Sequence, residues 1–143
     1  MILVDSNIIL YAEDKLSVYH EKARIWWDTQ LSGQEPVGLA WATILSYIRI
    51  CTNPRAILHP ITVDAALQTV RDWLAQPCVH ILQPTEQHWE IFSRLLKVNG
   101  YAANLTMDAH LAALAIEYGC ELYSADTDFS KFHGLRWKNP LKG

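Results

Sequence analysis

The sequence predicts an α/β fold: a three-layer α/β/α sandwich around a short-stranded, mainly parallel central sheet. Short apolar runs alternate along the chain with longer segments whose apolar residues recur at helical spacing. No hairpin turn separates neighbouring apolar runs, so the strands must be joined by crossover connections, which parallel sheets require. A length of 143 residues fits one domain over residues 1–143.

The first half of the chain predicts two strands and three helices. Ser6 is a candidate N-cap for the segment after the first strand, and Thr62 for the third of these helices. Asn53-Pro54 must stop the second helix. The elements expected here are a strand at 2–4, a helix at 18–31, a strand at 37–39, a helix at 42–51 and a helix after Thr62.

The second half predicts two helices and three strands. Thr85 and Thr106 are the candidate N-caps of the helices, and Asn99-Gly100 and Gly119 are their C-terminal signals. The strands expected here lie at 79–82, 121–124 and 135–137.

Composition narrows the class of protein. The net charge of −3 argues against a protein that holds nucleic acid by bulk positive charge. The three cysteines are odd in number and far apart, which excludes a disulfide framework and a C-x-x-C site. The first residues carry no basic segment and the apolar run stops at Asp5, so we expect no signal peptide and a cytoplasmic protein.

Several carboxylates lie next to predicted buried elements, where apolar residues are more usual. Asp5 follows the first strand, Asp108 lies in the first turn of an almost wholly apolar helix, and Asp126 and Asp128 follow the strand at 121–124. Each alone is explained as a cap or turn residue. Together they meet at one edge, because the carboxyl ends of parallel strands and the helix N-termini after them lie on the same side. Clustered carboxylates repel one another, and a hard divalent cation such as Mg²⁺ or Mn²⁺ keeps them ionised.

Other metal sites fail on spacing. An EF-hand loop starting at Asp126 would need glycine at Lys131 and glutamate at Trp137. The six histidines form no i, i+4 pair. His110 is two residues after Asp108, so on a helix it faces elsewhere, and we expect a core or surface histidine.

Four segments of the chain resemble PIN-domain proteins, specifically VapC-type toxins. These segments are MILVDSN, LSYIRICTNPR, NLTMDAHLAALAIEYG and LYSADTDFSKFHGLRWKNPL. The resemblance runs essentially end to end and implies a single PIN domain over residues 1–143. It further implies a Mg²⁺- or Mn²⁺-dependent endoribonuclease that acts on RNA, with transfer RNA or ribosomal RNA loops as targets. Such toxins are homodimers that a cognate VapB-type antitoxin holds silent.

The resemblance also assigns roles to the acidic residues. Asp5, Asp108 and Asp126 match the metal-binding acids of the family, and Asp128 matches a frequent auxiliary acid, so all four are candidate catalytic residues. The supporting residues that the resemblance implies are Asn7 and Ser124, which match polar residues that steady the acids through hydrogen bonds.

One position departs from the family pattern. The second acid of the family usually stands where this chain has Ser46, which puts metal affinity and catalytic efficiency in question. We expect Ser46 to be a third supporting residue, with its hydroxyl or a water in the place of the missing carboxylate. Arg49, three residues later, is a candidate contact for a substrate phosphate, and a helix-surface salt bridge is the alternative.

Two other functions compete with the ribonuclease. A phosphatase of the haloacid dehalogenase type needs a second acid two residues after the first, where this chain has Asn7. A catalytically silent PIN domain that binds RNA or a protein partner stays open because of Ser46. Metal-dependent cleavage of RNA, hydrolysis of phosphate esters, or neither, separates the three.

Overall fold

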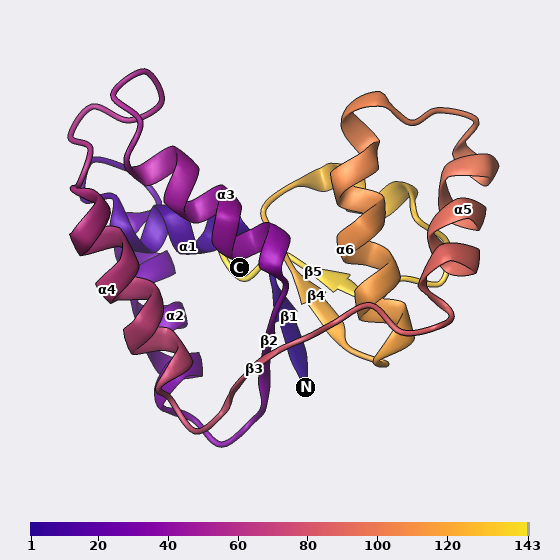
Figure 1. Cartoon of the computed structure of the whole chain (residues 1–143), viewed down its shortest axis with the longest axis horizontal. Coiled ribbons are helices and arrows are strands. Elements are labelled where there is room, and N and C mark those ends of the chain that lie inside the picture. Colours follow the sequence, from indigo (N-terminus) through magenta and orange to yellow (C-terminus); the bar gives the residue numbers. More distant parts are fainter. Residues whose placement is uncertain (143) are drawn as a thin grey trace.

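The computed structural model describes residues 1–142 and contains a five-stranded sheet in the order β3-β2-β1-β4-β5 (Figure 1). All four strand pairings are parallel, which confirms the predicted sheet. The first strand in sequence is central, so later elements pack on either side of it. The strands are β1 Ile2–Val4, β2 Val37–Leu39, β3 Val79–Ile81, β4 Glu121–Tyr123 and β5 Trp137–Lys138.

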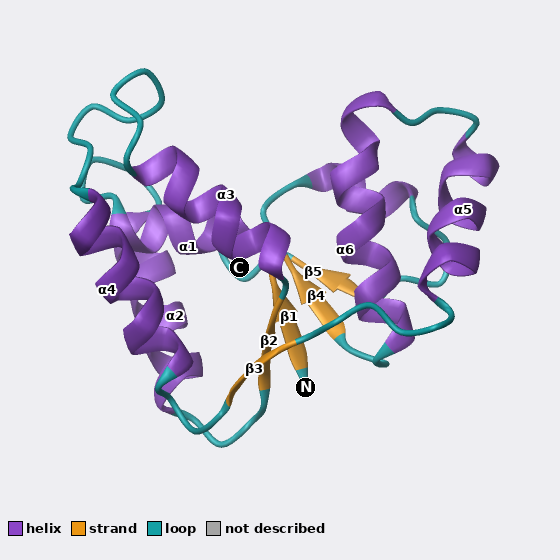
Figure 2. Cartoon of the chain, viewed as in Figure 1, coloured by secondary structure: helices purple, strands orange, loops and turns teal. Residues whose placement is uncertain are grey.

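The helices form two layers, one on each face of the sheet (Figure 2). Four helices cover one face and two cover the other, so the predicted three-layer sandwich is confirmed. The first layer contains α1 Ser6–Glu13, α2 His20–Ser32, α3 Trp41–Cys51 and α4 Val63–Leu74. The second contains α5 His88–Asn99 and α6 Thr106–Glu117, with the 3₁₀ turns η1 Ala103–Leu105 and η2 Thr127–Lys131.

The alternation of side chains along β1 divides the core in two. Ile2 and Val4 belong to the cluster formed with α1–α4, whereas Leu3 belongs to the cluster formed with α5 and α6. This is the period-2 pattern of a strand buried on both faces. At Gly38 in β2 an added Cβ would lie 2.6 Å from the Leu82 side chain, so the glycine leaves the space that this side chain fills.

Aromatic and cysteine side chains contribute to both parts of the core. Trp27 and Trp73 are buried and meet edge to face, with ring centroids 5.8 Å apart. The cysteines at positions 51, 78 and 120 are free and buried. Trp89 is different, since it is 70% exposed on the outer side of α5.

Three predicted helix caps are wrong. Asp5, not Ser6, caps α1, because its carboxylate accepts the Ser6 N–H. Thr85 does not cap α5: Gln87 occupies that position, and the Thr85 side chain bonds the Gln87 N–H and a glutamate on α6 instead. Thr106 lies inside α6 because η1 leads directly into that helix.

Thr62 caps α4 as predicted, and Gly100 ends α5 in the left-handed conformation, φ 64°. The remaining boundaries move by one or two residues, most in β5, which begins at Trp137 rather than at residue 135. Within residues 1–142 no helix has the length and hydrophobicity that crossing a membrane requires.

Candidate functional site

A cavity of about 530 Å³ opens at the carboxyl ends of β1 and β4. Residues of α1, α3, α6 and the turn after β4 line it, so elements from both ends of the chain meet there. The lining residues are Asp5, Ser6, Asn7, Ala42, Thr43, Leu45, Ser46, Arg49, Met107, Asp108, Leu111 and Asp126.

Asp5 lies at the floor of the cavity and is 9% exposed. One carboxylate oxygen accepts the Ser6 N–H at 2.7 Å, and the other accepts the Ser124 hydroxyl at 2.8 Å. Burial raises the pKa of the Asp5 carboxyl in spite of these hydrogen bonds, and the charge of Asp126 adds to the effect. Both oxygens are therefore held in fixed positions.

Ser124 and Asn7 form the frame beneath the acids. The Ser124 hydroxyl donates to Asp5 and accepts from the Asn7 amide at 3.1 Å and from the Asp126 N–H at 3.0 Å. The Asn7 amide oxygen in turn accepts the Ala125 N–H at 3.3 Å. These bonds tie the start of α1 to the turn after β4; the supporting role of both residues stays a prediction.

Three carboxylates converge at the cavity: Asp108 and Asp126, which line it, and Asp128. Oxygen atoms of Asp108, Asp126 and Asp128 all lie within 4.8 Å of one another. Asp126 caps η2 by accepting the Asp128 N–H at 2.9 Å, and α6 supplies Asp108 from its first turn. Burial, together with the charges of the neighbouring acids, raises the pKa of Asp108 to about 7.

This arrangement fits a hard divalent cation, because the available ligand atoms are all carboxylate oxygens and lie close together. The sequence predicts Asp5, Asp108 and Asp126 as ligands and Asp128 as an auxiliary acid. The structure groups Asp128 with Asp108 and Asp126, and it engages Asp5 with Ser6 and Ser124. Direct coordination by Asp5 stays a prediction.

The side of the cavity formed by α3 carries no carboxylate among its lining residues. Ser46 stands there, and its hydroxyl accepts a hydrogen bond from Ser6 at 3.4 Å. Arg49 lies one turn further along α3 and is exposed, so its guanidinium is available at the rim.

Sequence reasoning missed Lys131, whose ammonium group lies 3.0 Å from an oxygen of Asp128. The signal was present as the D-x-x-K spacing in DFSK, since residues three apart align in a 3₁₀ turn. It also missed two exposed apolar residues at the cavity, Leu45 and Met107.

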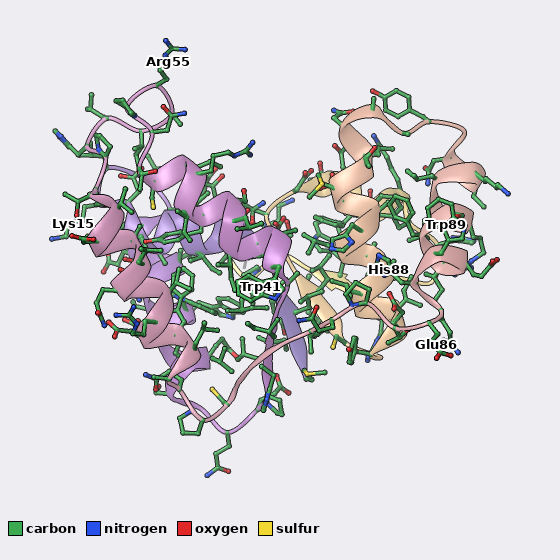
Figure 3. The ribbon with its side chains drawn as sticks, viewed as in Figure 1. Lys15, Trp41, Arg55, Glu86, His88 and Trp89 are labelled. Carbon is green, nitrogen blue, oxygen red and sulfur yellow. The ribbon has the colours of Figure 1, made fainter. Side chains whose placement is uncertain are left out.

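His110 lies outside the site, as expected. Its Nδ1 is 3.0 Å from Nε2 of His88, whose other ring nitrogen contacts Glu117. Figure 3 shows His88 between α5 and α6. Glu117 also accepts the N–H and hydroxyl of Thr85, so both of its carboxylate oxygens are hydrogen-bonded.

Comparison with known proteins identifies a matching family and several similar proteins. The model of the PIN domain family matches residues 2–135. Ribonuclease VapC37 of Mycobacterium tuberculosis is 41% identical over 140 residues, which cover 98% of this chain and 97% of the relative. Ribonuclease VapC33 of the same organism is 38% identical over 142 residues, 99% of either chain.

Solved structures share the fold at low identity. VapBC2 of Rickettsia felis, solved with a DNA fragment from its promoter, superposes with a TM-score of 0.71 at 14% identity, covering 97% of this chain and 98% of the other. VapC20 of Mycobacterium tuberculosis, a toxin that cleaves the sarcin–ricin loop, gives a TM-score of 0.66 at 17% identity, covering 95% and 99%.

Proposed function

The chain belongs to the PIN domain family, and from this premise we propose that it is a metal-dependent endoribonuclease, the VapC-type toxin of a type II toxin–antitoxin pair. The observation that carries the proposal is the cluster of Asp108, Asp126 and Asp128, of which the first two line the same cavity as Asp5. Relatives that share up to 41% of their residues with this chain over nearly its whole length are named ribonucleases.

The acidic cluster supports dependence on Mg²⁺ or Mn²⁺. Asp108, Asp126 and Asp128 would hold the cation, and Asp5 lies close enough to affect the charge balance of Asp108. When bound, such a cation lowers the pKa of a water molecule and offsets charge on a phosphodiester during in-line displacement. Ser124 and Asn7 keep the acids in place, so little reorganisation is needed when substrate arrives.

The proposed substrate is RNA, which reaches the acidic residues over the rim of the cavity. Arg49 lines the cavity and is exposed, which supports a role in pairing with a substrate phosphate and offsetting the repulsion between an anionic substrate and an acidic site. No histidine lines the cavity among the described residues, so the carboxylates are the groups available to orient water. An unpaired loop of transfer or ribosomal RNA is the expected target class.

The proposed partners are a VapB-type antitoxin and a second copy of the chain. Neighbouring structures include VapBC complexes from Rickettsia felis, Haemophilus influenzae and Salmonella typhimurium. A second cavity, of about 440 Å³, lies between α1, α3 and the chain before α4, with apolar walls suited to an antitoxin segment. Exposed Trp41, Leu45 and Met107 beside the acidic cavity suit a homodimer contact. RNA and antitoxin would both be met in the cytoplasm.

Cleavage of RNA by the purified chain tests the function. We expect cleavage with Mn²⁺ or Mg²⁺ and none after EDTA treatment. Metal-independent cleavage would overturn the proposed chemistry. Metal binding without cleavage of any cellular RNA would instead favour the silent PIN domain, which Ser46 on the acid-free side of the cavity keeps open as the second candidate.

A further inference from the structure

Lys131 stands on the turn that carries two of the clustered acids. In η2, residues three apart align, and this divides the turn into two sides. Phe129 and the following Phe132 are 1% and 3% exposed and pack into the core beside α6. Asp128 and Lys131 are aligned in the same way and form an ion pair at 3.0 Å.

Hydrogen bonds hold the turn at both ends. Asp126 caps its start, and the Lys131 carbonyl accepts a hydrogen bond at 3.4 Å from Asn99 at the end of α5. The Lys131 side chain itself is 52% exposed and free to change rotamer. Its charge acts on the cluster, because it opposes the rise in the pKa of Asp108 that burial and the other acids cause.

We propose that Lys131 is the internal counter-ion of the acidic site and competes with the divalent cation for Asp128. In the metal-free protein the ammonium group occupies the outer side of the Asp128 carboxylate. A cation that binds the oxygen paired with Lys131 has to displace the ammonium group from it. This inference rests on the proposed function, since it takes the cluster to be a metal site.

Competition between Lys131 and the cation predicts the opposite change in metal affinity from a positioning role. If Lys131 oriented Asp128 for the metal, its removal would weaken metal binding. Because an ammonium group both occupies a ligand and repels a cation, its removal should strengthen binding. The two accounts are therefore separated by the sign of one measurement.

The experiment is a calorimetric titration of the purified, metal-free chain with Mn²⁺ at low ionic strength. Lys131→Met should bind Mn²⁺ about three- to tenfold more tightly than the unmodified chain, and Lys131→Arg within about twofold of it. The matched control is Lys138→Met, which removes a lysine paired with Glu121 at 3.4 Å outside the cavity and should leave Mn²⁺ affinity unchanged. Circular dichroism melts check that each variant folds.

A second variant tests whether the effect passes through Asp128. In an Asp128→Asn background the ammonium has lost its partner, so Lys131→Met should change Mn²⁺ affinity much less. An equal change in both backgrounds, or unchanged or weaker binding by Lys131→Met alone, would overturn the inference while leaving the metal site in place. No Mn²⁺ binding by either the unmodified chain or Lys131→Met would overturn the proposed metal site together with it.

Discussion

Asp108, in the first turn of α6, and Glu117, its last residue, are carboxylates on one helix with opposite surroundings. Asp108 faces other acids, and burial with their charges raises its pKa to about 7. Burial alone would also raise the pKa of Glu117, but hydrogen bonds from Thr85 and His88 outweigh it and lower the pKa instead. The Glu117 side chain has no accessible surface, yet each of its oxygens has a donor.

The helix itself would produce the reverse order. A helix dipole stabilises a negative charge at the N-terminus, where Asp108 lies, and destabilises one at the C-terminus, where Glu117 lies. Neighbouring side chains therefore decide both charges. The comparison teaches how to distinguish the two kinds of carboxylate: one supplied with donors holds the fold together, and one left among like charges is available to a ligand.

The largest effect on RNA cleavage should follow removal of a charge at the N-terminal end of α6, where Asp108 lies among other acids. Asp126→Asn and Asp108→Asn should each lower RNA cleavage roughly a hundredfold or more, because each keeps the side-chain size but removes an anionic ligand. Asp64→Asn is the matched control, since Asp64 is an exposed acid in the first turn of α4. Single-turnover cleavage rates at saturating Mn²⁺ give the answer, and full activity in either site variant would refute the assignment.

Substitution of Glu117, at the C-terminal end of α6, should change the stability of the protein rather than its activity. Glu117→Ala leaves Thr85 and His88 without their acceptor, which should cost about 2–3 kcal/mol of unfolding free energy and lower Tm by about 6–9 °C. Glu86→Ala, at an exposed residue of the same region, should change stability by less than about 0.5 kcal/mol.

Cleavage per folded molecule should survive the Glu117→Ala change. Loss of cleavage in a folded Glu117→Ala protein would break the division between the two ends of α6. Metal affinity measured on the same sample shows whether such a loss originates at the acidic cluster.

The two ends should also respond to pH in opposite directions. Between pH 3.8 and about 7 the folded protein keeps a proton on Asp108 that the unfolded chain has lost, so unfolding free energy falls as pH rises through this range. Metal-free Asp108→Asn should therefore melt about 2–4 °C above the unmodified chain at pH 8 and close to it near pH 4. Thermal melts in EDTA measure this, and a difference independent of pH would contradict it.

Glu117 supplies the contrast. Its pKa is lowered on folding, so its contribution is present above its unfolded pKa of 4.5 and is lost as the pH falls through the lower folded value. Glu117→Gln should thus lose stability relative to the unmodified chain at neutral pH and approach it in acid. A parallel pH response of Glu117→Gln and Asp108→Asn would show that surroundings do not separate the two ends.

The smallest effect is expected on the acid-free side of the cavity. Ser46→Glu adds a charge facing the cluster and should tighten Mg²⁺ binding several-fold, with faster cleavage at low Mg²⁺. Ser46→Gln controls for size. If Ser46 only packs against the helix layer, Ser46→Glu will bind Mg²⁺ as before and melt lower, since it buries an unpaired carboxylate.

Local patterns predict the elements well where burial alone decides them. β1 and β2 lie at the predicted residues. Short apolar runs that are buried on both faces are typical of strands in a parallel sheet, so their positions can be read from the sequence. The predicted cap at Thr85 is wrong for a tertiary reason, because Glu117 on α6 takes up the Thr85 hydroxyl. The predicted cap at Thr106 is wrong for a local one, because η1 continues directly into α6. β5 is placed by its pairing with β4 rather than by its own composition.

The same distinction applies to the site. Convergence of Asp5, Asp108 and Asp126 on one cavity follows from topology, so it was predictable from the order of strands and helices. Their division of roles was not. Whether a carboxylate oxygen is already hydrogen-bonded, as in Asp5, or ion-paired, as in Asp128, depends on side chains brought together by the fold.

The central position of β1 has a consequence for synthesis. β1 is made first but pairs with β4, whose residues Glu121–Tyr123 are added more than a hundred positions later. Because chains emerge from the ribosome N-terminus first, a nascent chain carries Asp5 long before Asp108 and Asp126 exist. The acidic cavity therefore assembles only after the residues through Asp126 have left the exit tunnel, so the growing chain carries an incomplete cluster until then.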